Sequence, residues 1–312
     1  MKIRHRQATP VSLQRPSPVA DVVDTVGPKG DTVHLAGKEM PVAPASLGTK
    51  LSLGVCAVGG AWALSNVVAQ VASQPTLGGV LVSSGLALGA AVAAYQGADL
   101  FSGFFHHGMD NYAKSTTPVV GETAAIARSH HYFANSSEQT SVAGEMDPIA
   151  KVVAPALAAL AVLDPHYAIA AGSLGALGAV LLCQVSHRWT HLAKPPAIVE
   201  GMTKLGLVQK REDHHAHHRA PWISNYCFVN GSFNPILDKT NFWRHYERTV
   251  FNVTGVEPKS WNHPAVKDLA LGKIDQAEFD GRFKAEIPLF KAAIGFEAER
   301  EESRQFLHGR FV

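Results

Sequence analysis

The feature that most constrains this chain is a long stretch without charge. From residue 51 to residue 98 the sequence contains no Asp, Glu, Lys or Arg. A membrane-spanning helix needs about 20 apolar residues to cross a hydrocarbon core of about 30 Å, so this stretch accommodates two crossings. The polar sequence Ser73-Gln74-Pro75-Thr76 divides it, and we expect spans at about 51–73 and 77–98.

A second pair of apolar segments follows at 148–163 and 167–186, separated by Asp164-Pro165-His166. The first of these segments is short and carries Lys151 near its start. Gly and Ala are abundant in all four segments, as close helix packing in lipid allows. The sequence therefore predicts four membrane spans.

The flanking charges predict how the spans are oriented. The connectors 74–76 and 164–166 carry no Lys or Arg, whereas basic residues flank the other ends of the spans. The positive-inside tendency then places both termini in the cytoplasm. Independently, four crossings put all the clustered histidines on one face of the membrane, whereas a single crossing at 148–186 would divide them. The metal site described next is therefore expected on the cytoplasmic side.

Histidine pairs follow the apolar segments. The chain has 16 histidines and three cysteines, which favours nitrogen and oxygen ligands at any metal site. His187 and His191 are four residues apart, and His214, His217 and His218 form an H-x2-HH pattern, so each set can share one helix face. Neutral imidazole is the commonest metal ligand in proteins. These spacings indicate a metal site, in which His215 is an alternative to His214.

The end of the second predicted span carries a helical stripe. Asp99, Gly103, His106 and Asp110 fall at positions i, i+4, i+7 and i+11. Ionisable groups near membrane depth are costly and usually functional, so we favour metal ligation over a solvated helix end. His107 points about 100° away from the stripe and is expected to be a bystander.

The candidate ligands outnumber the needs of one metal ion. One zinc ion takes four ligands, whereas this chain offers about twice as many. Two irons that activate oxygen fit such a set, and the sequence lacks the HExxH pattern of a zinc hydrolase. The candidates are His106, His130, His131, His187, His191, His214, His217 and His218, with Asp110, Asp99 and His215 as further candidates.

The order of these motifs resembles the lipid desaturase family. The pattern D-x3-G-x2-H-x3-D, then HH, then Q-x2-H-x3-H, then H-x2-HH-x2-P extends over about 98–261. The family includes plasmanylethanolamine desaturases and a plant chloroplast fatty acid desaturase that acts on phosphatidylglycerol. Departures are His107, where the family usually has Trp, and His215, where a non-histidine is common.

The resemblance implies an activity, its cofactor and its partners. The implied reaction is the O2-dependent dehydrogenation of an acyl or alkyl chain on a glycerophospholipid, with two Fe ions held by the eight histidines. The chain shows no cytochrome, flavin or iron–sulfur motif, so an external electron donor of the ferredoxin or cytochrome b5 type is implied. The net charge of +2 gives no indication of nucleic-acid binding.

Two other functions fit the same pattern. A membrane diiron hydroxylase could use the same ligands and differ only in how the substrate lies. A non-enzymatic metal carrier would need ionisable residues deep within the spans, whereas these histidines lie at span ends and beyond.

The predicted fold is all-α. It is an integral membrane four-helix bundle with a cytoplasmic helical cap that carries the histidine-rich metal site. Residues 1–49 are expected to form a disordered tail, whose basic start we interpret as a plain tail rather than an organelle transit peptide. Residues 50–261 would form the membrane domain and 262–312 a helical, solvated C-terminal extension, in which charges are dense from Glu297 to Arg304.

Overall fold

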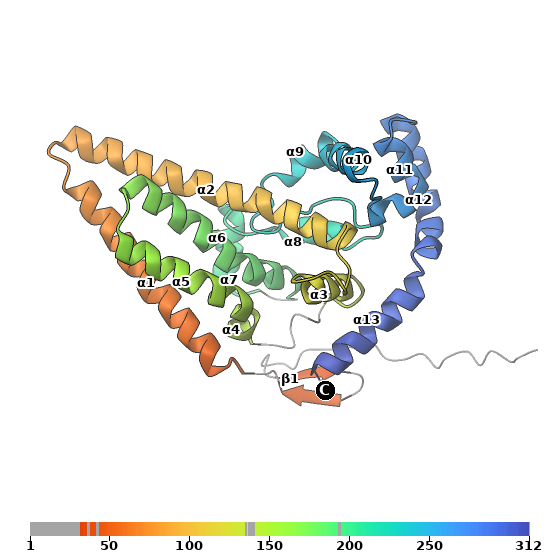
Figure 1. Ribbon diagram of the computed structural model, residues 1–312, viewed down its shortest axis with the longest axis horizontal. Coiled ribbons are helices and arrows are strands. Elements are labelled where there is room, and N and C mark those ends of the chain that lie inside the picture. The colour runs from red at the N-terminus through yellow and green to blue at the C-terminus, as the bar shows by residue number, and fades with distance from the viewer. Residues whose placement is uncertain are drawn as a thin grey trace, which may run out of the picture.

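The computed structural model describes residues 32–35, 38–41, 44–134, 136, 141–192 and 195–311, and most of them are helical (Figure 1). Residues 1–31, including the basic start of the predicted tail, lie outside the described residues. Two short antiparallel strands, β1 (Thr32–Leu35) and β2 (Lys38–Pro41), fall inside the stretch predicted to be disordered. Within the described ranges, this hairpin is the one sheet in a chain that is otherwise built from helices.

Four apolar helices pack together and share one hydrophobic core. They are α1 (Leu47–Ala72), α2 (Leu77–Asn111), α5 (Asp147–Leu163) and α6 (Tyr167–His191). The side chains of Ser46 and Thr76 accept hydrogen bonds from the backbone N–H groups at the starts of α1 and α2, and these caps fix where both helices begin. In Figure 1, α1 lies along α5 and α2 along α6.

Three of these helices, α1, α2 and α6, are long and apolar enough to cross a membrane, as judged over the described residues. The remaining predicted span forms α5, which has 17 residues. At about 1.5 Å per residue, α5 is shorter than a hydrocarbon core of about 30 Å. A fourth crossing, and with it the four-helix bundle, stays a prediction. The outward side chains of α2 include Leu81, 65 % exposed, and Leu88, 67 % exposed, as expected of a surface in contact with lipid.

Glycine lets α2 and α6 approach closely. A Cβ atom built on Gly175 of α6 would lie 2.2 Å from the carbonyl oxygen of Ala91 in α2, far inside van der Waals contact. Gly59 of α1 lies similarly close to the backbone of α5, where a Cβ atom would meet Leu157 at 3.1 Å. The abundance of small residues in the apolar segments therefore serves helix contact.

We expect Gly175→Ala to lower the free energy of unfolding by about 1–3 kcal/mol, because the added methyl group would force α2 and α6 apart. The matched control is Gly178→Ala on the same helix, where an added Cβ atom meets nothing within 4 Å. Thermal unfolding of the detergent-solubilised protein measures both. Equal midpoints for the two variants would contradict the close approach.

Further helices gather at the ends of α2 and α6 that lie farthest from the α1–α2 connection (Figure 1). Two of them, α3 and α4, lie between α2 and α5 in the chain. The full set is α3 (Gly121–Tyr132), α4 (Val142–Glu145), α7 (Ala197–Lys204), α8 (Arg211–His217), α9 (Asn234–Lys239), α10 (Phe242–Thr254), the 3-10 helix η2 (Lys259–Asn262), α11 (Pro264–Ala270), α12 (Gln276–Ala293) and α13 (Phe296–Phe311).

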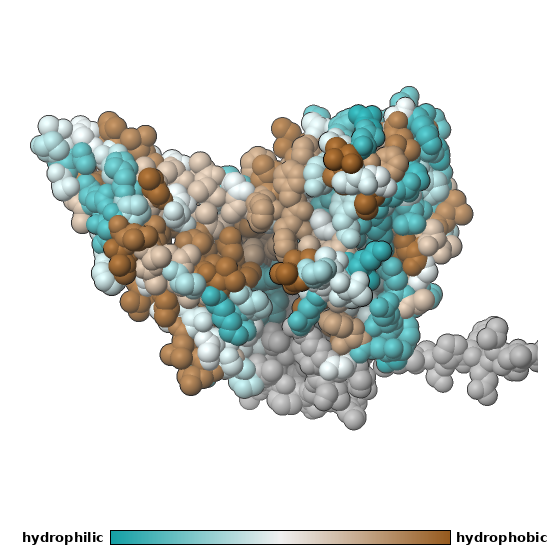
Figure 2. Space-filling model, in the orientation of Figure 1, coloured by the Kyte–Doolittle hydropathy of each residue, from teal (hydrophilic) through white to brown (hydrophobic). Residues whose placement is uncertain are grey.

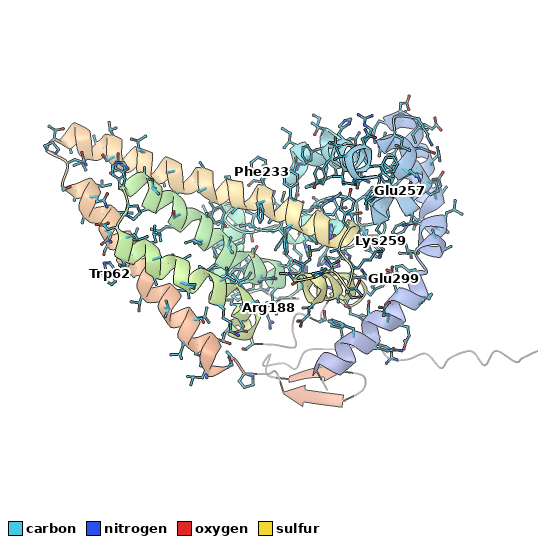
Figure 3. All side chains as sticks on the ribbon, in the orientation of Figure 1. Trp62, Arg188, Phe233, Glu257, Lys259 and Glu299 are labelled. Carbon is cyan, nitrogen blue, oxygen red and sulfur yellow. The ribbon has the colours of Figure 1, made fainter. Side chains whose placement is uncertain are left out.

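Residues 262–311 contain α11, α12 and α13, and one face of this segment is covered by the rest of the chain rather than solvated. Helix α13 lies against α3, where Glu299 accepts hydrogen bonds from the Tyr132 hydroxyl at 2.7 Å and from Lys259 Nζ at 2.5 Å (Figure 3). Phe290 of α12 and Leu307 of α13 are buried. This segment therefore has a charged outer face and an inner face that packs on the rest of the chain.

Candidate metal centre

The histidine motifs identified in the sequence converge where α2, α3, α6 and α8 meet. Their side chains form two groups, and within each group one ligand atom from every residue lies within 4.8 Å of the others. The first group is His130, His187, His191, His214 and His218. The second group is His106, Asp110, His131 and His217. All eight histidines singled out by spacing, together with Asp110, are therefore brought together.

The first group consists of imidazoles alone. His191 Nε2 lies 2.9 Å from His130 Nε2 and 2.8 Å from His214 Nε2. His218 Nε2 lies 2.9 Å from His214 Nε2. Ring nitrogens that all turn toward one point have the arrangement of ligands around a cation. This group could hold one metal ion with nitrogen ligands only.

The second group adds a carboxylate to three imidazoles. Asp110 Oδ2 lies 3.4 Å from His217 Nε2 and 3.5 Å from His106 Nε2. Both carboxylate oxygens of Asp110 are buried and have no hydrogen-bond partner among the residues that the structure describes. A buried carboxylate without partners is costly, and a metal ion would satisfy it. The residues present thus fit a cation at this position.

Adjacent histidines belong to different groups. On α3, His130 belongs to the first group and His131 to the second; at the end of α8, His218 belongs to the first and His217 to the second. Successive residues on a helix point about 100° apart, so a pair of neighbours can serve two metal ions but not one. The HH pairs are weak signals by themselves, and this division is their structural explanation.

Backbone carbonyls orient two rings of the second group. His106 Nδ1 donates to the carbonyl oxygen of Tyr226 at 3.0 Å, and His217 Nδ1 donates to that of Ser224 at 2.8 Å. A carbonyl can only accept, so the proton sits on Nδ1 and the Nε2 lone pair faces the group. Such contacts fix the tautomer and the orientation of metal-binding histidines.

Burial keeps these rings neutral. It lowers the pKa of His217 to about 4, and it also holds the pKa values of His131 and His214 well below their ordinary value. A histidine binds a metal ion only through an unprotonated nitrogen. At neutral pH the imidazoles outside the apolar helices are therefore ready to act as ligands.

Asp99 does not belong to either group, although it lies on the predicted stripe. Its carboxylate is fully buried and accepts hydrogen bonds from the backbone N–H groups of Val229, Asn230 and Gly231 at 3.1, 2.9 and 3.0 Å. It anchors the loop after the H-x2-HH motif. Gly103, on the same stripe, serves packing, because a Cβ atom there would lie 2.6 Å from Cys227 Sγ.

His215 and His107 also lie outside both groups. Among the described residues, the His215 ring contacts one other ring, that of His191, at a centroid distance of 6.1 Å. His107 is fully buried behind the site. Its Nε2 lies 3.1 Å from Glu247 Oε1. Its ring stacks on that of Trp243, with centroids 4.9 Å apart and an interplanar angle of 11°.

Sequence reasoning missed the buried polar network around Glu247. This carboxylate also accepts from Arg244 at 2.8 Å, Ser260 at 2.8 Å and Trp261 Nε1 at 3.0 Å, so it links α10 to η2. No spacing in the sequence signals this network, because its members come together only in the folded chain.

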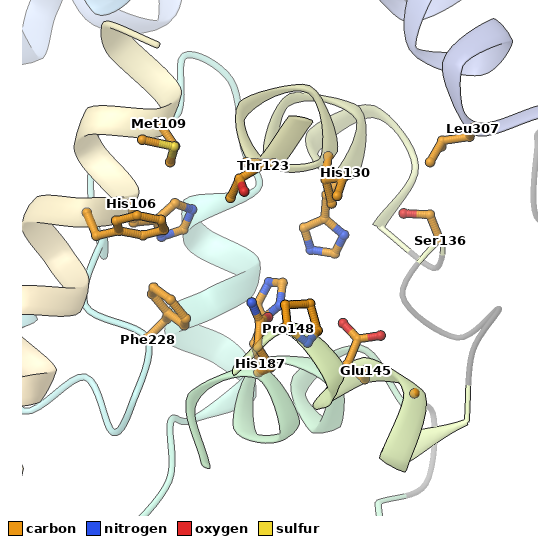
Figure 4. Close-up of a pocket in the computed structure, with 15 residues that line it drawn as sticks. His106, Met109, Thr123, His130, Ser136, Glu145, Pro148, His187, Phe228 and Leu307 are labelled. Atoms are coloured by element: carbon orange, nitrogen blue, oxygen red, sulfur yellow. The ribbon is translucent and has the colours of Figure 1, made fainter. Parts of the chain in front are cut away.

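A pocket of about 200 Å³ adjoins both groups (Figure 4). His106 of the second group and His130 and His187 of the first group line it. Its apolar lining includes Phe105, Met109, Ile126, Pro148, Phe228 and Leu307, and Gln184 and Glu145 supply polar groups. Figure 2 shows a hollow here, below the end of α2 and between α5 and α3. The pocket is therefore largely apolar and borders both ligand groups.

Comparisons with known proteins agree with this geometry. The family model described as "Lipid desaturase domain" matches residues 95–261. "Fatty acid desaturase 4-like 1, chloroplastic" from Arabidopsis thaliana is 35 % identical over 179 residues, which are 56 % of this chain and 60 % of that protein. "Plasmanylethanolamine desaturase" from Myxococcus xanthus is 28 % identical over 179 residues, which are 56 % of this chain and 64 % of that protein.

A third relative, "Fatty acid desaturase 4, chloroplastic" from Arabidopsis thaliana, is 33 % identical over 190 residues, 58 % of each chain. The chain therefore spans about three fifths of the length of the relatives it matches. No solved structure matches it. The matched region contains every residue of the two ligand groups.

Proposed function

The chain belongs to the lipid desaturase family, and from this membership we propose that it is a membrane-bound diiron desaturase. The proposed substrate is an acyl or alkyl chain on a glycerophospholipid, and the proposed reaction is its O2-dependent dehydrogenation. The carrying observation is that both ligand groups border one largely apolar pocket. A zinc hydrolase would need neither two such groups nor an apolar chain beside them.

The two ligand groups would divide the metal ions between them. The first group would hold one iron through five imidazoles, and the second group would hold the other through three imidazoles and Asp110. When bound, the irons supply oxygen activation and the removal of two hydrogen atoms from neighbouring carbons. The balance is one alkane segment, O2, two electrons and two protons in, and one alkene and two water molecules out.

The protein's own part is to bind the chain and to keep the site dry. Phe105, Met109 and Phe228 offer an apolar surface along which methylene groups can lie beside His106. None of the described lining residues is Lys or Arg, so the lining favours the hydrocarbon over an anionic headgroup. Buried, neutral imidazoles would hold the metal ions in place of a shell of water molecules.

Substrate, donor and location follow from the family and the apolar helices. The relatives are named as fatty acid and plasmanylethanolamine desaturases, which supports a lipid-linked chain as substrate. Two electrons per turnover would come from a ferredoxin or a cytochrome b5. The three candidate spans support an integral membrane protein, and the flanking basic residues support a site on the cytoplasmic side. The chloroplastic relatives make an organelle membrane the alternative location.

We expect the protein, reconstituted with phospholipid, iron, O2 and a reduced ferredoxin, to produce lipids that lack two hydrogen atoms in one chain. Mass spectrometry of the extracted lipids measures this change, and omission of the donor or of O2 should abolish it. A gained oxygen atom instead of a double bond would show the hydroxylase. Metal uptake into vesicles without any lipid product would show the metal carrier.

A further inference from the structure

Trp222 lies flat against a histidine of the second group. Its ring stacks on His131 with centroids 5.0 Å apart and an interplanar angle of 13°. Trp222 is buried and is not itself a candidate ligand. We propose that Trp222 is a positioning residue for His131 and that the C-terminal extension holds Trp222 in place. This inference rests on the proposed function, because it takes His131 as an iron ligand.

His131 needs such support more than its neighbours do. The rings of His106 and His217 are fixed by carbonyl acceptors on Nδ1. Among the described residues, no hydrogen bond is made by His131 Nδ1, and its Nε2 faces His217 Nε2 at 2.9 Å. The flat contact with the larger indole restricts rotation of the His131 ring, which is the role that the carbonyls play for the other two rings.

The backbone of Trp222 is fixed from the site side. Its φ of 59° lies in the left-handed region, which a bulky residue rarely adopts. The Trp222 N–H donates to the carbonyl oxygen of Arg219 at 3.0 Å, and the Trp222 carbonyl accepts from the Tyr226 hydroxyl at 2.7 Å. These contacts aim the indole at α3.

Two phenylalanines of the extension contact the indole ring, beside Lys259 of η2 and Tyr132 of α3, whose ring meets it edge-on at 5.6 Å and 76°. Phe296 of α13 lies near-parallel to it at 6.2 Å and 16°, and Phe290 of α12 meets it edge-on at 5.6 Å and 76°. Lys259 Nζ lies 5.2 Å from the ring centroid, in cation–π range. Both phenylalanines lie outside the matched family region, which ends at residue 261.

The extension is itself tied to the site. Glu299 of α13 joins Lys259 to Tyr132, the residue that follows His131 (Figure 3). About two turns further along α13, Leu307 lines the pocket (Figure 4). A segment that the sequence marks as a charged appendage therefore contacts the indole, the helix that carries His131 and the pocket wall.

Competition with an iron chelator tests the proposal on the purified full chain. We expect Trp222→Leu and Phe296→Ala to bind one of the two irons roughly 10- to 100-fold more weakly than the parent, which is the usual cost of losing a residue that orients a metal ligand. The other iron should keep its affinity. Trp222→Phe, which retains a flat ring, should restore most of the loss.

The control is Gln305→Ala, an exposed position on α13, which should match the parent. Circular dichroism confirms that each variant is folded at the assay temperature; if Trp222→Leu does not fold, Phe296→Ala decides. Equal affinity of both irons in Phe296→Ala and parent would overturn the proposal, and so would equal weakening of both irons. A parent without iron would overturn the proposed function instead.

Discussion

His187→Ala and His217→Ala are each expected to remove one iron, so that the iron content falls from about two per chain to about one. Each substitution should also lower the rate of desaturation at least about a hundredfold. His187 belongs to the first group and His217 to the second, so the two variants empty different positions. Loss of a residue that merely orients a ligand already costs roughly 10- to 100-fold, so loss of a ligand should exceed that range. Elemental analysis and lipid analysis of the same preparations measure both effects.

The chain offers a matched control for these variants. His215 lies within the same histidine run but outside both groups, so His215→Ala should keep both irons and the activity. The HH pair on α3 extends the test. His130→Ala should lose the same iron as His187→Ala, and His131→Ala should lose the same iron as His217→Ala. Zinc in the parent, or variants with unchanged metal content, would refute the diiron site.

Asp99→Ala is expected to lower the free energy of unfolding by about 3 kcal/mol or more. The substitution leaves the buried N–H groups of Val229, Asn230 and Gly231 without their acceptor, and each orphaned group costs about 1–3 kcal/mol. Asp99→Asn keeps one oxygen and should lose less. Thermal unfolding of the metal-free protein in detergent measures this, because bound metal would otherwise contribute to stability.

Two comparisons separate anchoring from metal ligation at Asp99. Asp280→Ala, at an exposed position on α12, should leave the unfolding midpoint unchanged. Below its own unfolding temperature, Asp99→Asn should bind the same amount of iron as the parent. A stable Asp99→Asn variant that lacks one iron would show that this carboxylate is a ligand after all.

Local spacing predicted the parts of the site that a single helix determines. The continuation of α2 to Asp110 and of α6 to His191 follows from i, i+4 patterns, and the structure confirms both helices. The apolar segments likewise predicted the four packed helices. Whether three or four of these helices cross the membrane depends on the length of α5, which is a few residues shorter than a usual span. Composition alone does not decide this point.

The parts that the sequence could not predict depend on contacts between segments far apart in the chain. The stripe places Asp99 on the correct face of α2, but only the folded loop shows that backbone N–H groups, and not a metal ion, meet it. Glu247 and its partners give no periodic signal at all. In the extension, the charge run suggested solvent, although Phe290 and Phe296 within that charged context could have indicated a packed face.

Because neighbouring histidines belong to different ligand groups, the chain itself limits the distance between the two groups. On α3 and at the end of α8, one residue serves each group, and their Cα atoms are joined by a single peptide unit of about 3.8 Å. Covalent geometry at these two places therefore limits how far the two ligand groups can move apart. An insertion of one residue between either pair of histidines would change the separation of the groups.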